Sequence, residues 1–271
     1  LQDALIHATK GLSAYAHRAR ALGVTDDEIN IFTLESLFTT VTNVNFDEDR
    51  LTGLVNRTVA LRAKAKELYE QACAKAGKTP ESPNGPATWT PPTTRGELAK
   101  EGEKISIAVR QAERGDDVAG LEELLVYGIK GIAAYADHAH ILGQSDDVVY
   151  AFIHEALDFI SQPHTVDELL PLVLRAGEVN LRTMELLDAG NTGTYGHPEP
   201  TAVRTTPKAG KAILVSGHDL KDLEALLQQT EGKGINIYTH SEMLPAHGYP
   251  ELKKYAHLAG NYGGAWQDQR K

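Results

Sequence analysis

An internal repeat constrains this 271-residue chain more than any other feature of its sequence. Residues 1–70 align with residues 121–190 at a constant offset of 120 positions, without a gap. The matched pairs include Lys10-Gly11 with Lys130-Gly131, Asp26-Asp27 with Asp146-Asp147, and Leu61-Arg62 with Leu181-Arg182. A fixed offset over this length indicates two copies of one supersecondary unit, each with its own core.

Each copy has the pattern of three amphipathic helices. Over residues 1–22, apolar residues recur every three or four positions and form one stripe. Thr25 and Glu28 have the spacing of a capping box, which predicts the start of the second helix. The third helices are predicted over about 47–76 and 166–188. Three such helices joined by short turns predict an up-down-up bundle in each copy.

Proline and glycine divide the rest of the helical part. Residues 77–94 hold five prolines and are predicted to form a loop. Residues 95–114 are predicted to form one connecting helix. The stretch 191–210 is rich in glycine, threonine and proline, so we expect a linker there. The predicted order is helical repeat 1 at 1–76, loop 77–94, connecting helix 95–114, helical repeat 2 at 117–190, linker 191–210 and an α/β segment at 211–271.

The α/β segment changes from helical to strand–helix–strand patterning. Residues 212–216 form a continuous apolar run typical of a buried parallel strand, and residues 235–239 form a second one. An amphipathic helix lies between them, and residues 260–264 are predicted to form a later turn. The pattern predicts a right-handed βαβ unit with parallel strands. We therefore expect a multidomain α and α/β fold, with two duplicated three-helix bundles followed by the start of a Rossmann-like parallel domain.

Two side chains that can bind metals follow the two predicted strands. His218 comes just after the first strand and Glu242 just after the second. Ligands of open parallel sheets bind beyond the carboxyl ends of the strands, and neighbouring strands lie about 4.8 Å apart. An imidazole nitrogen and a carboxylate oxygen that meet there suit a transition metal such as iron or zinc. On spacing alone, a helix cap with an incidental histidine remains the alternative interpretation.

Composition excludes several classes of partner. The formal net charge of −10 disfavours nucleic acid, and no run approaches the about 18 apolar residues that a membrane-spanning helix needs.

One cysteine, Cys73, excludes a disulfide within the chain and cannot hold a thiolate cluster by itself. We expect a cytoplasmic setting, because the start has no secretory pattern. Leu1 already lies in a helical pattern, so we expect an internal part of a longer polypeptide.

Several longer motifs resemble one protein family. They are Ile213–Leu223, which contains Ser-Gly-His-Asp, Tyr238–Pro250, which contains His-Ser-Glu-Met-Leu-Pro-Ala-His, Gly260–Gly263, and in the helical part Thr42–Asp47, Gly128–Gly131 and Leu187–Gly190. Together they resemble the hybrid cluster proteins, also called prismane proteins or hydroxylamine reductases. The resemblance covers essentially all 271 residues.

The resemblance implies an iron–sulfur enzyme that reduces hydroxylamine to ammonia and water, with nitric oxide as a further substrate and a redox partner protein as electron donor. It implies an iron–sulfur cubane and a hybrid iron–sulfur–oxygen cluster. The motif residues that bind the hybrid cluster in the family correspond to His218 and Glu242. His240 and His247 lie beside Glu242 and could supply protons or orient ligands. A structural hydrogen bond is the alternative interpretation of these two histidines.

The sequence departs from the family pattern in its cluster ligands. The cysteines that hold the cubane, the further cysteines of the hybrid cluster and its second glutamate have no counterpart here. We therefore expect these residues to bind neither cluster without the remaining segments of the same polypeptide. Two alternatives stay open. One is a relative of nickel-type carbon monoxide dehydrogenase, against which the motif at Tyr238–His247 argues. The other is a cluster-free helical scaffold or interaction module.

Overall fold

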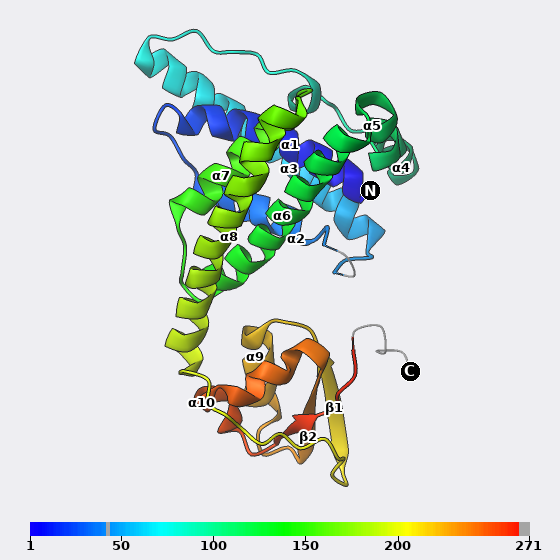
Figure 1. Ribbon diagram of the computed structural model, residues 1–271, viewed down its shortest axis with the longest axis vertical. Helices are drawn as coiled ribbons and strands as arrows, with labels where there is room; N and C mark the ends of the chain where they lie inside the picture. The colour runs from blue at the N-terminus through cyan, green and yellow to red at the C-terminus, as the bar shows by residue number, and fades with distance from the viewer. Residues whose placement is uncertain (42–43, 266–271) are drawn as a thin grey trace. The chain divides into compact units, whose positions relative to one another are not determined.

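The computed structural model describes residues 1–41 and 44–265. Over these residues the chain is mostly helical and carries one three-stranded parallel sheet (Figure 1). Thr42 and Asn43, which begin one of the motifs quoted above, lie outside the described residues. No helix in the described part of the chain combines the length and the apolar character that crossing a bilayer demands.

Two compact units make up the chain. The helical unit comprises Leu1–Asp137 and Ser145–Met184, and the sheet unit comprises His138–Gln144 and Glu185–Lys271. The long helices of the chain are α1 (Gln2–Arg20), α2 (Asp27–Phe38), α3 (Glu48–Ala76), α6 (Asp116–Ile141), α7 (Asp147–Phe159) and α8 (Val166–Tyr195). In the helical unit, α1 packs against α3 and α7.

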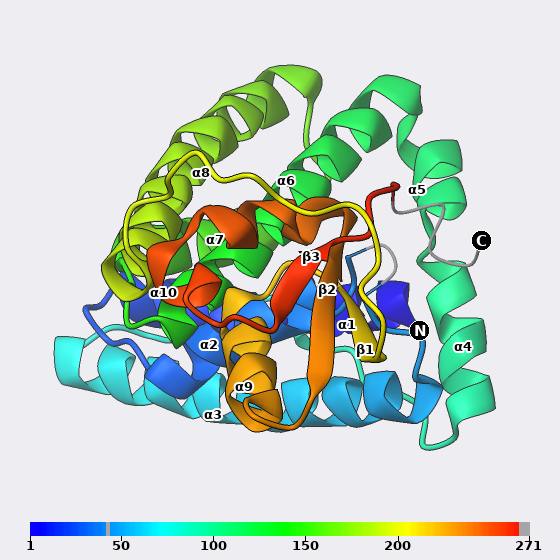
Figure 2. The same cartoon turned by 90° about the horizontal axis from the view of Figure 1, so that it is seen from below.

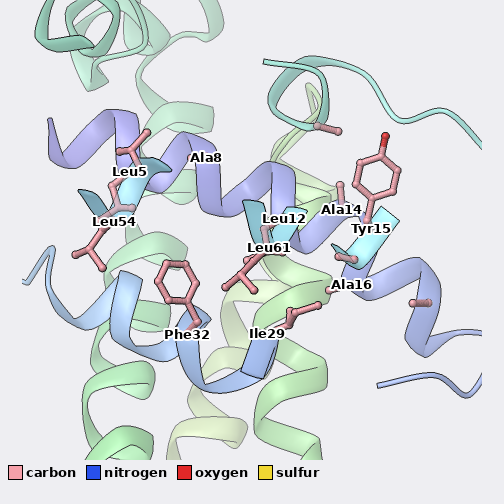
Figure 3. Packing of buried hydrophobic residues seen from close by; sticks show 14 of the residues in the cluster. Leu5, Ala8, Leu12, Ala14, Tyr15, Ala16, Ile29, Phe32, Leu54 and Leu61 are labelled. Carbon is pink, nitrogen blue, oxygen red and sulfur yellow. The ribbon is translucent and has the colours of Figure 1, made fainter. Parts of the chain in front are cut away.

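The core around α1 follows the apolar stripe of its sequence. Leu5 and Leu12 are fully buried on one face of α1. Phe32 of α2 and Leu54 of α3 pack into the same cluster, as Figure 3 shows. Burying each large apolar side chain contributes about 1.5–3 kcal/mol, so this stripe is a main source of stability in the unit.

Aspartates cap helices α2 and α7, one residue later than the sequence analysis predicted. The side chains of Asp26 and Asp146 each accept a hydrogen bond from a backbone N–H in the first turn of α2 and α7. The predicted start at Thr25 was therefore wrong by one position. Aspartate caps a helix as well as threonine does, and its charge also interacts favourably with the helix dipole. Asp26 gains a further partner, because Lys64 Nζ lies 2.7 Å from its Oδ2.

The proline-rich loop approaches α1 at a glycine. A short 3-10 helix, η1 (Gly85–Ala87), lies in this loop, and a Cβ added at Gly11 would overlap the carbonyl oxygen of Pro86. Arg62 Nη1 donates a hydrogen bond of 2.8 Å to the same oxygen. Gly11 is therefore required by a close backbone approach between two segments.

The connecting segment 95–114, predicted as one helix, is two helices. They are α4 (Arg95–Lys104) and α5 (Ile107–Arg114). The break falls at Ser106, whose backbone is extended, with φ −63° and ψ 163°. Serine favours helix starts over helix interiors, because its hydroxyl competes for local backbone groups. A single long helix was therefore the wrong expectation.

The predicted linker at 191–210 begins too early, because α8 continues to Tyr195. The side chain of Tyr195 is fully buried in the core of the sheet unit. This burial outweighs the low helix propensity of Gly190 and Gly193, which favoured an earlier end. Gly196 follows with a φ of +83° and ends the helix.

Within its described residues, the sheet unit carries three parallel strands in the order β1-β2-β3 (Figure 2). Its elements are β1 (Lys211–Ser216), α9 (Leu220–Thr230), β2 (Ile235–His240), the 3-10 helix η2 (Ser241–Gly248), α10 (Pro250–Lys253) and β3 (Leu258–Asn261). The predicted parallel pairing of the first two strands is confirmed. The third strand was missed, because a turn was predicted where β3 ends.

The burial of β1 was predicted wrongly. Leu214 at the middle of this strand is 54% exposed, and Ile213 and Val215 are only partly buried. In the described residues, β1 is an edge strand that pairs with β2. Ile213 and Val215 pack against the core cluster of the unit, whereas Leu214 points away from it. The buried part of that cluster includes Leu223 and Leu227 of α9 and Ile237 of β2.

Candidate functional site

His218 and Glu242 follow neighbouring strands at equivalent positions. The parallel register pairs Ser216, the last residue of β1, with His240, the last residue of β2. His218 and Glu242 each stand two positions beyond this pair. Both therefore lie at the carboxyl edge of the sheet, where ligands of parallel sheets bind.

The two side chains meet at this edge. Nε2 of His218 contacts Oε2 of Glu242. The side chains are 47% and 52% exposed, so the pair is reached from solvent. The structure thus brings together the two residues that the strand spacing selected. Their assignment as metal ligands remains a prediction.

The helix cap beside His218 is made by a different residue. Asp219 is the N-cap of α9, and its Oδ1 accepts hydrogen bonds from the backbone nitrogens of Lys221 at 2.7 Å and Asp222 at 3.2 Å. The His218 ring contacts Glu242. The alternative interpretation, an incidental histidine next to a cap, therefore does not account for the contact with the carboxylate.

Unusual backbone conformations precede both side chains. Gly217 has a φ of +153°, in a region that residues with a Cβ rarely adopt. Ser241, directly before Glu242, is the single non-glycine residue with positive φ in the described part of the chain, at +50°. For Ser241 such a conformation costs about 1–3 kcal/mol, and strain of this kind concentrates at functional sites, whereas glycine adopts positive φ freely. Here the two conformations lie directly before the two site residues.

His240 and His247 are both buried and hydrogen-bonded to β-strand residues. His240 is 3% exposed, and its Nδ1 lies 2.9 Å from Ser216 Oγ across the strand pair. His247 is 5% exposed, and its Nε2 lies 2.8 Å from Thr239 Oγ1. Burial lowers the pKa of His247, and a hydrogen bond with the backbone of Gly260 opposes that shift.

Two residues that the sequence analysis did not single out complete this arrangement. The side-chain amide of Asn261 donates to Thr239 Oγ1 at 2.9 Å, and the same oxygen lies 2.8 Å from His247 Nε2. His247 is therefore hydrogen-bonded to Thr239 and to the backbone of Gly260. Its geometry fits a structural role. Thr239 and Asn261 lie within motifs quoted for the family resemblance, and that was the only signal for them.

The described residues supply two donors at the site. Among them, no group of three or more histidine, cysteine, aspartate or glutamate side chains converges as a metal site. Cys73 is a buried free thiol in the core cluster of the helical unit. The donor set is thus one imidazole nitrogen and one carboxylate oxygen, a combination that suits iron or zinc.

Comparison with known proteins gives a consistent result over the whole chain. The model of the Prismane/CO dehydrogenase family matches residues 1–271. A hydroxylamine reductase of Rhodospirillum rubrum is 56% identical over 271 residues, which are 100% of this chain and 49% of that protein. Hydroxylamine reductases of Syntrophobacter fumaroxidans and Methanocella arvoryzae are 55% and 50% identical, covering 100% and 99% of this chain and 49% of each relative. The chain spans about half the length of the curated relatives it matches.

Proposed function

The chain belongs to the Prismane/CO dehydrogenase family, and from this premise we propose that it is part of an iron–sulfur oxidoreductase that reduces hydroxylamine. The reaction takes up two electrons and two protons, breaks the N–O bond and releases ammonia and water. The names of the similar proteins support this substrate. Nitric oxide is a further candidate that rests on the family resemblance of the sequence alone. The observation that carries the proposal is the contact between His218 and Glu242 at the sheet edge.

We assign His218 and Glu242 as ligands of a hybrid iron–sulfur–oxygen cluster. The pair fits this role, because it is half-exposed and combines nitrogen and oxygen donors, while Asp219 makes the cap of α9. When bound, the cluster supplies electrons and an exchangeable coordination position. The remaining ligands, the iron–sulfur cubane and the contact with a redox partner protein are assigned to other segments of the full-length polypeptide.

The histidines beside the pair have positioning roles in this proposal. His247 ties the end of η2 to β2 through Thr239, and Glu242 lies within the same short helix. His240 joins the ends of β1 and β2 through Ser216. Both contacts hold the backbone from which the two ligands project. His247 is a poor proton donor here, because both ring nitrogens are already engaged.

We further propose that the helical part is a duplication. Asp26 and Asp146, 120 positions apart, cap equivalent helices with nearly the same backbone conformation, φ −144° and ψ 122° against φ −142° and ψ 129°.

Substitution of the two ligands in the full-length protein tests the assignment. His218→Gln and Glu242→Gln should each lower hydroxylamine reduction at least about 100-fold and change the electron paramagnetic resonance signal of the hybrid cluster. The matched controls His197→Gln and Glu231→Gln alter exposed residues of the same unit and should leave both readouts unchanged. Unchanged turnover in either ligand variant would rule out the assigned role.

Metal analysis separates the proposal from its alternatives. Iron and acid-labile sulfide without nickel are expected in the full-length protein, whereas nickel would favour a carbon monoxide dehydrogenase. Absence of both metals after anaerobic reconstitution would favour the cluster-free scaffold. The isolated 271 residues should bind no cluster, and stoichiometric binding by them would refute the need for further segments.

A further inference from the structure

The repeated Lys-Gly pair places two buried lysines at one pocket of the helical unit. Lys10 of α1 and Lys130 of α6 are equivalent in the repeat alignment. Both line a pocket of about 760 Å³. Lys10 is 7% exposed and Lys130 is 8% exposed. Lysine is rarely buried to this extent without a partner of opposite charge.

The two ammonium groups have few partners in the described part of the chain. Lys130 Nζ lies 3.4 Å from the carbonyl oxygen of Thr40 and 4.9 Å from the ring centre of Tyr127. No hydrogen bond or ion pair of the described residues reaches Nζ of Lys10. Burial lowers the pKa of Lys10 to about 8 and also lowers that of Lys130. Both charges are thus only weakly compensated.

Most other charges at the pocket are paired with one another. Arg110 Nη1 lies 2.5 Å from Glu123 Oε1, and Arg95 Nε lies 3.2 Å from Glu48 Oε2. Asp3 and Glu123 are the acids whose charges act on Lys130, and the paired Glu122 and Glu123 are those that act on Lys10. The lining therefore carries an excess of positive charge, although the whole chain has a formal net charge of −10.

Apolar side chains form the rest of the pocket wall. Ile6 lines it from α1, and Val126 and Tyr127 line it from α6. A volume of about 760 Å³ lies within the range of small-molecule sites, which combine apolar walls with a few placed polar groups. An inorganic anion would occupy only the part of this space beside the two ammonium groups, so it can probe the anion position without filling the apolar part. The chemistry fits an anionic group attached to a larger, partly apolar body.

We propose that Lys10 and Lys130 bind a carboxylate or phosphate group in this pocket. The anion lies between the two repeat-equivalent ammonium groups, and the attached body contacts the apolar wall. The same chemistry has two sources, a small organic anion from solution or an acidic side chain from another segment of the full-length polypeptide. The proposal is independent of the proposed function, because the pocket belongs to the helical unit and the His218–Glu242 pair to the sheet unit.

Lysine reactivity in the full-length protein tests the proposal, with pyrophosphate as the probe. Trace acetylation read by mass spectrometry should slow at least about five-fold at Lys10 and Lys130 as pyrophosphate saturates the pocket. The exposed Lys78 and Lys233 are the controls and should show no change. Equal slowing at all four lysines would indicate ionic strength alone and overturn the proposal. In the Lys10→Met variant, saturable protection of Lys130 should be lost.

A second measurement identifies an occupant from the polypeptide itself. Carbodiimide joins an amine to a carboxylate only at direct contact. A crosslink from Lys10 or Lys130 to an acid outside these 271 residues would support a protein-borne carboxylate as the anion. If pyrophosphate gives no protection and no such crosslink forms, the proposal is overturned for both sources.

Discussion

Thr239 Oγ1 lies 2.8 Å from Nε2 of His247, which ties the far end of η2 to the strand that precedes it. The same hydroxyl oxygen accepts a hydrogen bond of 2.9 Å from Asn261 of β3. Glu242 lies between Thr239 and His247 in the sequence, near the start of η2. The position of this carboxylate therefore depends on a buried hydroxyl in β2.

Thr239→Val should destabilise the sheet unit and, in the full-length protein, lower the proposed turnover of hydroxylamine. Valine has nearly the same shape but leaves the buried polar groups of His247 and Asn261 without their partner, which costs about 1–3 kcal/mol. The free energy of unfolding in urea measures this loss. Thr239→Ser keeps the hydroxyl and is the matched control. Equal stability of the two variants would contradict the assigned role.

The repeat offers a matched pair of glycine substitutions. Gly11→Ala should destabilise the helical unit by about 1–3 kcal/mol, because the new Cβ overlaps the carbonyl oxygen of Pro86. At Gly131, the equivalent position, nothing lies within 4 Å of the added Cβ. Gly131→Ala should stabilise the helix by about 0.5–1 kcal/mol. Thermal unfolding of the two variants compares them, and a shift of the same sign in both would contradict the prediction.

A buried histidine should make the helical unit sensitive to acid. His154 is 1% exposed, and its ring nitrogens lie 3.0 Å from Ser13 Oγ and 3.2 Å from Asn30 Oδ1. Burial first, and then the charges of Arg20 and His17, lower the pKa of His154 from 6.5 to about 3. Between these two values the unfolded chain binds a proton that the folded chain does not. Stability therefore falls as the pH drops from about 6.5 to about 3.

The size of this effect is measurable from urea unfolding between pH 7 and pH 4. One such histidine contributes a slope of up to about 1.4 kcal/mol per pH unit. His154→Gln removes the titrating group. The slope of the free energy of unfolding against pH should therefore fall by up to the amount that one bound proton contributes. His7, whose pKa burial lowers to about 4, acts with the same sign, so His7→Gln should flatten it further. An unchanged slope in His154→Gln would refute the prediction.

The sequence predicted the helices and strands that have their own pattern of apolar residues. The apolar stripe at 1–22 predicted α1, and the apolar runs at 212–216 and 235–239 predicted β1 and β2. β3 has no such signal, because Gly260 is a weak strand former. It depends on a distant segment, since Asn261 N donates a hydrogen bond of 2.9 Å to the carbonyl oxygen of Arg204.

In the candidate site, too, some contacts were predictable from the sequence and others were not. The proximity of His218 and Glu242 was predictable, because each follows a strand and parallel strands end at one edge. Thr239 and Asn261 were not, because their contact requires β3 beside β2. The exposure of β1 was also beyond prediction, since an apolar run shows neither which face is covered nor whether the strand lies at an edge.

The N-cap of α9 separates the structural role of one residue from the chemical role of its neighbour. Asp219 accepts two backbone hydrogen bonds, so Asp219→Ala should cost about 1 kcal/mol of stability. Asn caps a helix as well as Asp does, so Asp219→Asn should retain both stability and hydroxylamine turnover. His218→Gln should show the opposite pattern, with stability retained and turnover lost. Loss of turnover in Asp219→Asn with an unchanged free energy of unfolding would move the chemical role from His218 to the carboxylate beside it.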